Sequence, residues 1–169
     1  MSKTATYALI SSVTGTGSST TISFTSIPAT YTDLIIVLNG SLSTGNNTRM
    51  RFNNNTGSNY SMTVLTGDGS GGFPAVGSYS DGNQAAFSYP GYYDTAMSMN
   101  IIHIMDYANT TTNKTFLQRN SKASNQSQVA VGLYRSTSAI NQVDIYTATG
   151  ATWTTATTAK LYGIQAGNA

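Results

Sequence analysis

The strongest hydrophobic pattern in the chain is an uninterrupted aliphatic run, LIIVL, at residues 34–38. Most of its residues are β-branched and turn formers bound it, which is typical of a strand covered on both faces. A hinge precedes it at residues 26–33, where Pro28 fixes its own φ and favours an extended conformation for Ile27. The sequence therefore predicts a corner followed by a strand at the centre of the core.

Similar strand patterns recur along the chain, separated by turns rich in Ser, Thr, Asn and Gly. They cover residues 7–13, 20–25, 48–52, 59–65, 97–107, 114–118, 128–134, 140–146 and 159–164. The glycine-containing connection at residues 15–19 predicts that the first two form a hairpin. Residues 67–93 show only weak periodicity, which predicts a functional excursion or one or two short strands, with residues 85–89 as the best candidate.

Alternation within these strands separates two faces. Arg49 and Arg51 alternate with Met50 and Phe52, so the arginines are expected to face solvent or a partner and the apolar pair to face the core. In the segment 97–107, one face carries Met97, Met99, Ile101, His103 and Met105, and the other carries Asn100, Ile102, Ile104 and Asp106. No window shows helical periodicity. We therefore expect an all-β, antiparallel two-sheet β-sandwich of eight to ten strands, jelly-roll-like, forming one domain over residues 1–169.

The low charge content limits the classes of possible partner. Charged residues make up 8% of the chain, whereas about 25% is usual for globular proteins. The eight basic residues are dispersed, so the net charge of +2 reflects few acids and not a basic patch, which disfavours nucleic acid as a partner. No apolar run is long enough for a transmembrane helix, and we expect a chain made in a cytoplasm and soluble there, without membrane insertion.

Candidate chemistry is sparse. His103 is the single histidine, and a catalytic arrangement would have to use Asp106 or Asp144, but no nucleophile motif accompanies it, so a hydrogen-bonded histidine within a sheet is the simpler interpretation. The six acids are aspartates at positions typical of caps and turns, and the glycine-rich segment 67–72 lacks the further ligands of a calcium or phosphate loop. There are no cysteines. We expect no enzyme activity, catalytic residue, metal or cofactor.

Aromatic residues point instead to a contact surface. Tyrosine and phenylalanine concentrate in the weakly periodic segment, and such amphipathic rings bind sugars or protein neighbours. The interface or glycan-binding candidates are Arg49, Arg51, Phe73, Tyr79, Tyr89, Tyr92, Tyr93 and Trp153. The alternative is that these rings cover one end of the sandwich.

Four blocks of the sequence stand out together. They are ISFTSIPATYTDL at 22–34, RMRFN at 49–53 continuing to NYS at 59–61, GLYRSTSAIN at 132–141, and LYGI at 161–164. As a set they resemble a widespread family of small virion proteins of tailed bacteriophages, common in marine and environmental phages and described as structural, head-decoration or tail-fibre proteins. The resemblance implies a location in the virion after assembly in the host bacterial cytoplasm, and it implies no catalytic residues.

Composition and resemblance lead to one expectation with two alternatives. The expectation is a non-enzymatic structural protein on the particle exterior, a capsid decoration or cement subunit, with the major capsid protein or tail proteins as partners and with homo-oligomers. No collagen-like or coiled-coil shaft precedes the predicted sandwich, which favours decoration over a long fibre. The alternatives are a tail-fibre or spike domain that binds a receptor or host surface glycan, and, less favoured, a glycan depolymerase.

Overall fold

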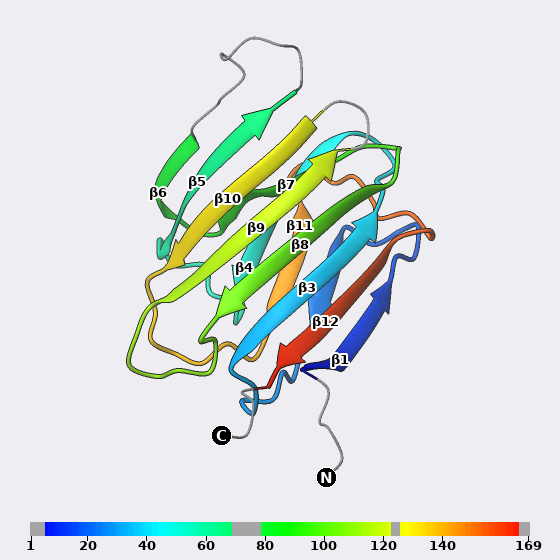
Figure 1. Cartoon of the computed structure of the whole chain (residues 1–169). Coiled ribbons are helices and arrows are strands. Elements are labelled where there is room, and N and C mark those ends of the chain that lie inside the picture. Colours follow the sequence, from blue (N-terminus) through cyan, green and yellow to red (C-terminus); the bar gives the residue numbers. More distant parts are fainter. Residues whose placement is uncertain (1–5, 69–78, 123–125, 166–169) are drawn as a thin grey trace.

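The computed structural model describes residues 6–68, 79–122 and 126–165, and it consists of two antiparallel β-sheets packed face to face (Figure 1). The strands are β1 (Tyr7–Thr14), β2 (Thr21–Phe24), β3 (Asp33–Gly40), β4 (Asn46–Phe52), β5 (Tyr60–Gly67), β6 (Tyr79–Gln84), β7 (Phe87–Tyr93), β8 (Ser98–Met105), β9 (Lys114–Lys122), β10 (Gln126–Tyr134), β11 (Val143–Thr147) and β12 (Thr158–Ile164). This confirms the predicted all-β sandwich, although the described residues form twelve strands where eight to ten were expected. The described residues include no helix that could cross a membrane.

The strand order is that of a jelly roll with one extended sheet. The larger sheet runs β1-β12-β3-β8-β9-β10-β5-β6 and the smaller runs β2-β11-β4-β7. Four antiparallel pairs, β1 with β12, β2 with β11, β3 with β8 and β4 with β7, form the eight-stranded jelly-roll motif. The strand pairs β5-β6 and β9-β10 are insertions into this motif, and together they add four strands to one side of the larger sheet.

The core lies between the two sheets. Leu34, Ile36 and Leu38 of β3 are fully buried there. A cluster of aromatic rings fills one side of the core: Phe52, Tyr60, Phe87, Phe116 and Tyr134, with neighbouring ring centroids 4.5 to 6.5 Å apart. Edge-to-face and stacked pairs of this kind stabilise a core beyond the area that they bury.

Two packing expectations are wrong. β1 and β2 do not form a hairpin, because β1 pairs with β12 in one sheet and β2 pairs with β11 in the other. Their connection crosses between the sheets, and the Gly15 and Gly17 amides donate to the carbonyls of Thr157 and Trp153. The apolar run of β3 is also not covered on both faces, since its residues alternate between buried and half-buried.

The weakly periodic segment contains two strands, β6 and β7, where a short strand or two was expected. Strand β7 begins at Phe87 and includes Pro90, which an edge strand tolerates because no neighbour needs its missing amide hydrogen. Its pairing with β4 shifts between the partners of Asn47 and Arg49, so a bulge interrupts the alternation. This irregularity explains why the period of two is weak there.

Candidate interaction surface

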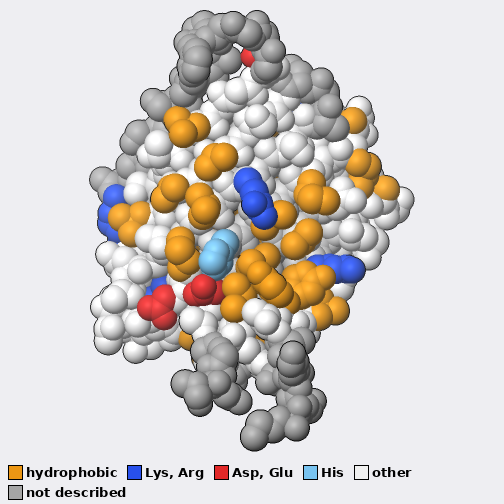
Figure 2. Space-filling model, viewed as in Figure 1, with side chains coloured by type: hydrophobic (Ala, Val, Ile, Leu, Met, Phe, Trp, Pro, Cys, Tyr) orange, Lys and Arg blue, Asp and Glu red, His pale blue; other side chains and the backbone are white. Residues whose placement is uncertain are grey.

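The outer face of the larger sheet carries an exposed apolar band that crosses the strands (Figure 2). Cross-strand pairing places its side chains in two neighbouring rows. One row is Leu9, Tyr162, Ile35, His103, Leu117 and Val131, and the other is Lys160, Val37, Ile101, Arg119, Val129 and Leu65. Leu9, Val131 and Leu65 expose 57%, 53% and 51% of their surface, so both ends of the band are open to water, whereas Ile35, Val37 and Ile101 at its centre are half-buried. We call these two rows the apolar band.

The rows on either side of the apolar band are more polar. One carries Thr158, Asn39, Met99, Ser121 and Ser127, and the other carries Ile164, Asp33, Met105, Thr115, Leu133 and Ser61. These rows are mixed, since they contain Met99, Ile164, Met105 and Leu133, but they are more polar than the centre, as the rim of a protein interface is.

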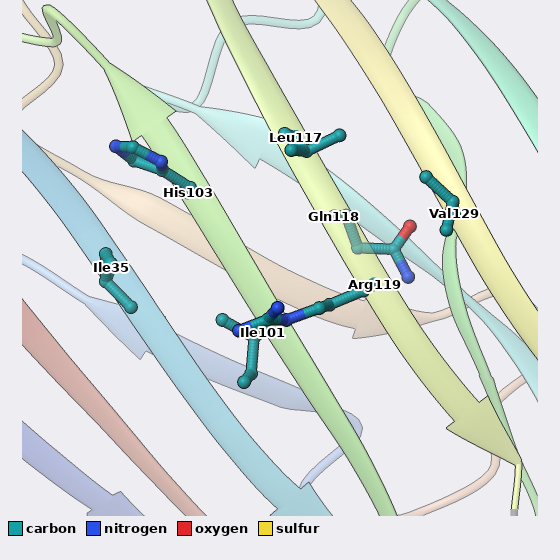
Figure 3. A pocket seen from close by; sticks show the side chains of 7 residues that line it. All are labelled: Ile35, Ile101, His103, Leu117, Gln118, Arg119 and Val129. Carbon is teal, nitrogen blue, oxygen red and sulfur yellow. The ribbon is translucent and has the colours of Figure 1, made fainter.

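A shallow depression of about 280 Å³ lies at the centre of the apolar band (Figure 3). Its lining is Ile35, Ile101, His103, Leu117, Gln118, Arg119 and Val129. The Arg119 side chain extends from β9 across the sheet toward Ile101 on β8, so its aliphatic part lies along the surface. Arginine often occupies the centre of interfaces, because its stem packs on apolar groups while its guanidinium hydrogen-bonds.

His103 is held by Asp33 and not by either aspartate proposed from the sequence. Its Nε2 lies 2.9 Å from the Asp33 Oδ2, and the other carboxylate oxygen accepts a hydrogen bond of 2.8 Å from the Asp106 amide. The side chains of His103 and Asp33 expose 34% and 21% of their surface. The neighbours of His103 in the depression are aliphatic, amide and guanidinium groups, none of which is a nucleophile. The pair therefore pins the start of β3 to the turn after β8.

The outer face of the smaller sheet has a different character. Arg51 donates from Nη2 to the Tyr146 hydroxyl at 3.0 Å and from Nε to the Ala85 carbonyl at 3.2 Å, while Arg49 on the same face is exposed. Asp144 also lies on this face, opposite Arg51, and accepts a hydrogen bond from the Gln142 amide. This face is polar and rich in hydrogen-bonding groups.

The candidates predicted from the sequence do not form one site. Arg49 and Arg51 face away from the core as expected, on the outer face of the smaller sheet. Tyr92 is half-buried, with the Lys122 ammonium 4.3 Å above its ring. Phe73 lies outside the described residues, and of Tyr79 and Tyr89 only the strand positions in β6 and β7 are described.

Tyr93 and Trp153 are not surface residues. Both are fully buried, with ring centroids 5.0 Å apart, and Trp153 forms an isolated bridge with Leu42 that closes one end of the sandwich. Burial raises the pKa of the Tyr93 hydroxyl, while the nearby Asn100 side chain lowers it to a lesser extent. That hydroxyl has no hydrogen-bond partner of ordinary geometry. These two rings belong to the core, in agreement with the alternative that aromatic residues cover an end of the sandwich.

The buried Lys114 side chain holds two loops together. Its ammonium donates to the Thr112 carbonyl at 2.7 Å and to the Thr137 carbonyl at 3.2 Å, so it connects the loops beside β9 and β10. Burial lowers the pKa of Lys114, and the charge of Asp106 opposes this shift. Among the described residues, no group of three acidic, histidine or cysteine side chains could hold a metal ion.

The apolar band was not predicted, although one signal for it is in the sequence. Strands β3 and β8 are apolar on both faces: Ile35 and Val37 alternate with Leu34 and Ile36, and Ile101 alternates with Ile102. In a two-layer sandwich only one face of a strand meets the core. A strand that is apolar on both faces of such a fold therefore indicates a second contact.

Comparison with known proteins assigns the chain to no family. No family model matches the chain, and no curated protein matches it. One solved structure, a Shewanella oneidensis protein described as of unknown function, aligns over 98% of this chain and 79% of its own, with 10% identity and a TM-score of 0.20. At that TM-score the likeness carries no conclusion about fold or function.

Proposed function

We propose that this chain is a non-enzymatic structural protein of a tailed-bacteriophage particle, located on the exterior as a capsid decoration or cement subunit. The observation that carries the proposal is the apolar band. It crosses seven strands, from β1 to β5. With neighbouring strands about 4.8 Å apart and residues of the two rows about 7 Å apart along each strand, the flat projection of the apolar band is roughly 400 Å². Lys160, His103 and Arg119 interrupt the patch, but an apolar patch of this size on a soluble protein is often functional, which supports a role in assembly.

The contrast between the two outer faces supports the same proposal. A subunit on a particle needs one face that is covered and one that water can hydrate. The apolar band meets the first need, and the face with Arg49, Arg51 and Tyr146 meets the second. Hydroxyl and amide side chains, rather than charges, provide most of the polar surface.

The composition of the particle tests this proposal. Particles released by the bacterial host that carries the gene would be purified, the copy number of this chain measured by quantitative mass spectrometry, and the chain located by cryo-EM reconstruction. A copy number that matches the capsid lattice is expected. A copy number typical of a tail tip would contradict the decoration role, and absence from purified particles would contradict the proposed function as a whole.

A receptor- or glycan-binding head of a tail fibre or spike is the second candidate. The observation that favours it is the Arg51 guanidinium beside the Tyr146 ring, 5.1 Å from the ring centroid, with the exposed Arg49 on the paired position. Aromatic rings flanked by hydrogen-bond donors can stack on sugars. Glycan-array binding that disappears in Tyr146→Ala, but persists in the control Ser23→Ala on the same face, would support this candidate.

A further inference from the structure

We infer that the apolar band is the contact between two copies of this chain, packed face to face through their larger sheets. The inference rests on the proposed function only in treating the apolar band as an assembly surface, and it names the occupant of that surface. Its support comes from the area of the face, its residue types and the symmetry of its pattern.

The area of the face matches the requirement of a stable dimer. Seven paired strands about 4.8 Å apart and four outward positions about 7 Å apart along each strand give a face of roughly 800 Å². A standard protein interface buries about 800 Å² on each partner. The apolar band occupies the middle of this face and the polar rows form its border, as in a stable interface.

The shape of the face suits another sheet. In the described strands β3, β8, β9 and β10, outward side chains alternate regularly with buried ones, so the surface is regularly pleated. Two such surfaces pack about 10 Å apart, as the two sheets of this sandwich do on their inner sides. Few charges interrupt it: the two apolar rows contain Arg119 and Lys160 together with His103, whose partner Asp33 lies in the bordering row.

The pattern is complementary to itself. A two-fold axis in the interface, parallel to β8, would exchange the positions of β9 and β3 and those of β10 and β12. Leu117 would then face Ile35 of the second copy, and Val131 would face Tyr162. Arg119 would face Val37, so the two copies of this cation would not oppose each other.

Sedimentation of the purified full chain tests the inference. We expect a dimer in analytical ultracentrifugation over roughly 1 to 100 µM. Val131→Glu should weaken dimerisation about a hundredfold, because a two-fold interface contains each substitution twice and each copy contributes about tenfold. Ser23→Glu is the matched control, since Ser23 is an exposed strand residue on the outer face of the smaller sheet. It should leave the dimer unchanged.

Two further measurements keep the outcomes clear. Circular dichroism and thermal unfolding establish that Val131→Glu is folded; if it is not, the near-isosteric Val131→Thr replaces it, with an expected weakening of about tenfold. A wild-type chain that stays monomeric at 100 µM overturns the inference. Binding of the apolar band to another virion protein or to lipid vesicles would not rescue it. A dimer broken by Ser23→Glu and not by Val131→Glu also overturns it. Neither result affects the particle-composition test of the proposed function.

Discussion

Two fully buried tyrosines, Tyr93 and Tyr60, differ in what their hydroxyl groups contact, and this difference predicts opposite effects of the same substitution. The Tyr60 hydroxyl accepts a hydrogen bond of 3.2 Å from the Phe52 amide and donates one of 3.0 Å to the Asn55 carbonyl. The Tyr93 hydroxyl has no partner of ordinary geometry. Tyr60→Phe therefore removes a hydroxyl that is hydrogen-bonded, whereas Tyr93→Phe removes one that is not.

The magnitudes follow from the cost of buried polar groups. Tyr60→Phe should lower the free energy of unfolding by about 1 to 3 kcal/mol, because it removes hydrogen bonds and leaves the buried Phe52 amide without an acceptor. Tyr93→Phe should instead raise it by about 1 kcal/mol, because the phenylalanine ring keeps the packing against Trp153 and no unpaired hydroxyl remains.

The pH dependence provides a second measure of the same burial. Burial raises the pKa of Tyr60, Tyr93 and Tyr107, so above about pH 10 the unfolded chain loses these protons while the folded chain retains them. The folded state then binds more protons, and stability falls as pH rises, by at most about 1.4 kcal/mol per pH unit for each tyrosine that stays protonated in the folded chain. Tyr93→Phe should make this fall shallower, because one of the buried tyrosines no longer contributes to it.

Urea unfolding followed by tryptophan fluorescence at pH 7 and between pH 9.5 and about 11 measures both quantities. The buried Trp153 is the single tryptophan and reports on the core. Equal losses of stability in the two phenylalanine variants at pH 7 would refute the assignment of an unpaired hydroxyl to Tyr93. An unchanged alkaline slope in Tyr93→Phe would show that this hydroxyl ionises in the folded protein.

Two further substitutions test the packing and the buried cation. A Cβ on Gly132 would lie 1.9 Å from the Phe116 ring, so Gly132→Ala should cost about 1 to 3 kcal/mol in urea unfolding, whereas Gly67→Ala, with its nearest neighbour 4.0 Å away, should be close to neutral. Burial lowers the pKa of Lys114, so the unfolded chain binds more protons between that lowered pKa and about 10.4, and stability should rise with pH over this window. In Lys114→Met this rise should be absent; a rise that persists would assign it to another group.

Much of the local structure could be predicted from alternation alone. Residues 48–52 have Arg49 and Arg51 on one face and buried Met50 and Phe52 on the other, as expected, because a side-chain period of two is a property of the extended chain. Strand pairing could not be predicted in the same way. The partner of β1 is β12, more than 140 residues away, and the glycine-containing turn at 15–19 is compatible with either a hairpin or a crossing between sheets.

The candidate surface was harder to predict, for a physical reason. Trp153 lies in a loop region, where a large ring is often exposed, but it is buried because its bridge with Leu42 closes the end of the sandwich. The apolar band requires the strand order, since Leu117 and Val131 become neighbours of Ile35 and Tyr162 only when β9 and β10 lie beside β8 and β3. Sequence periodicity assigns a face to each residue, but the topology assembles those faces into a surface.

The nesting of strands has a consequence for the timing of folding during synthesis. β1 and β2 emerge first from the ribosome, but their partners, β12 and β11, are among the last strands to be made. One edge of β3 also stays open until β12 inserts between β1 and β3. Such long-range pairings make folding slow and leave strand edges exposed meanwhile. The sandwich is therefore complete only after β12 has been translated, and its earlier strands are candidates for chaperone binding until then.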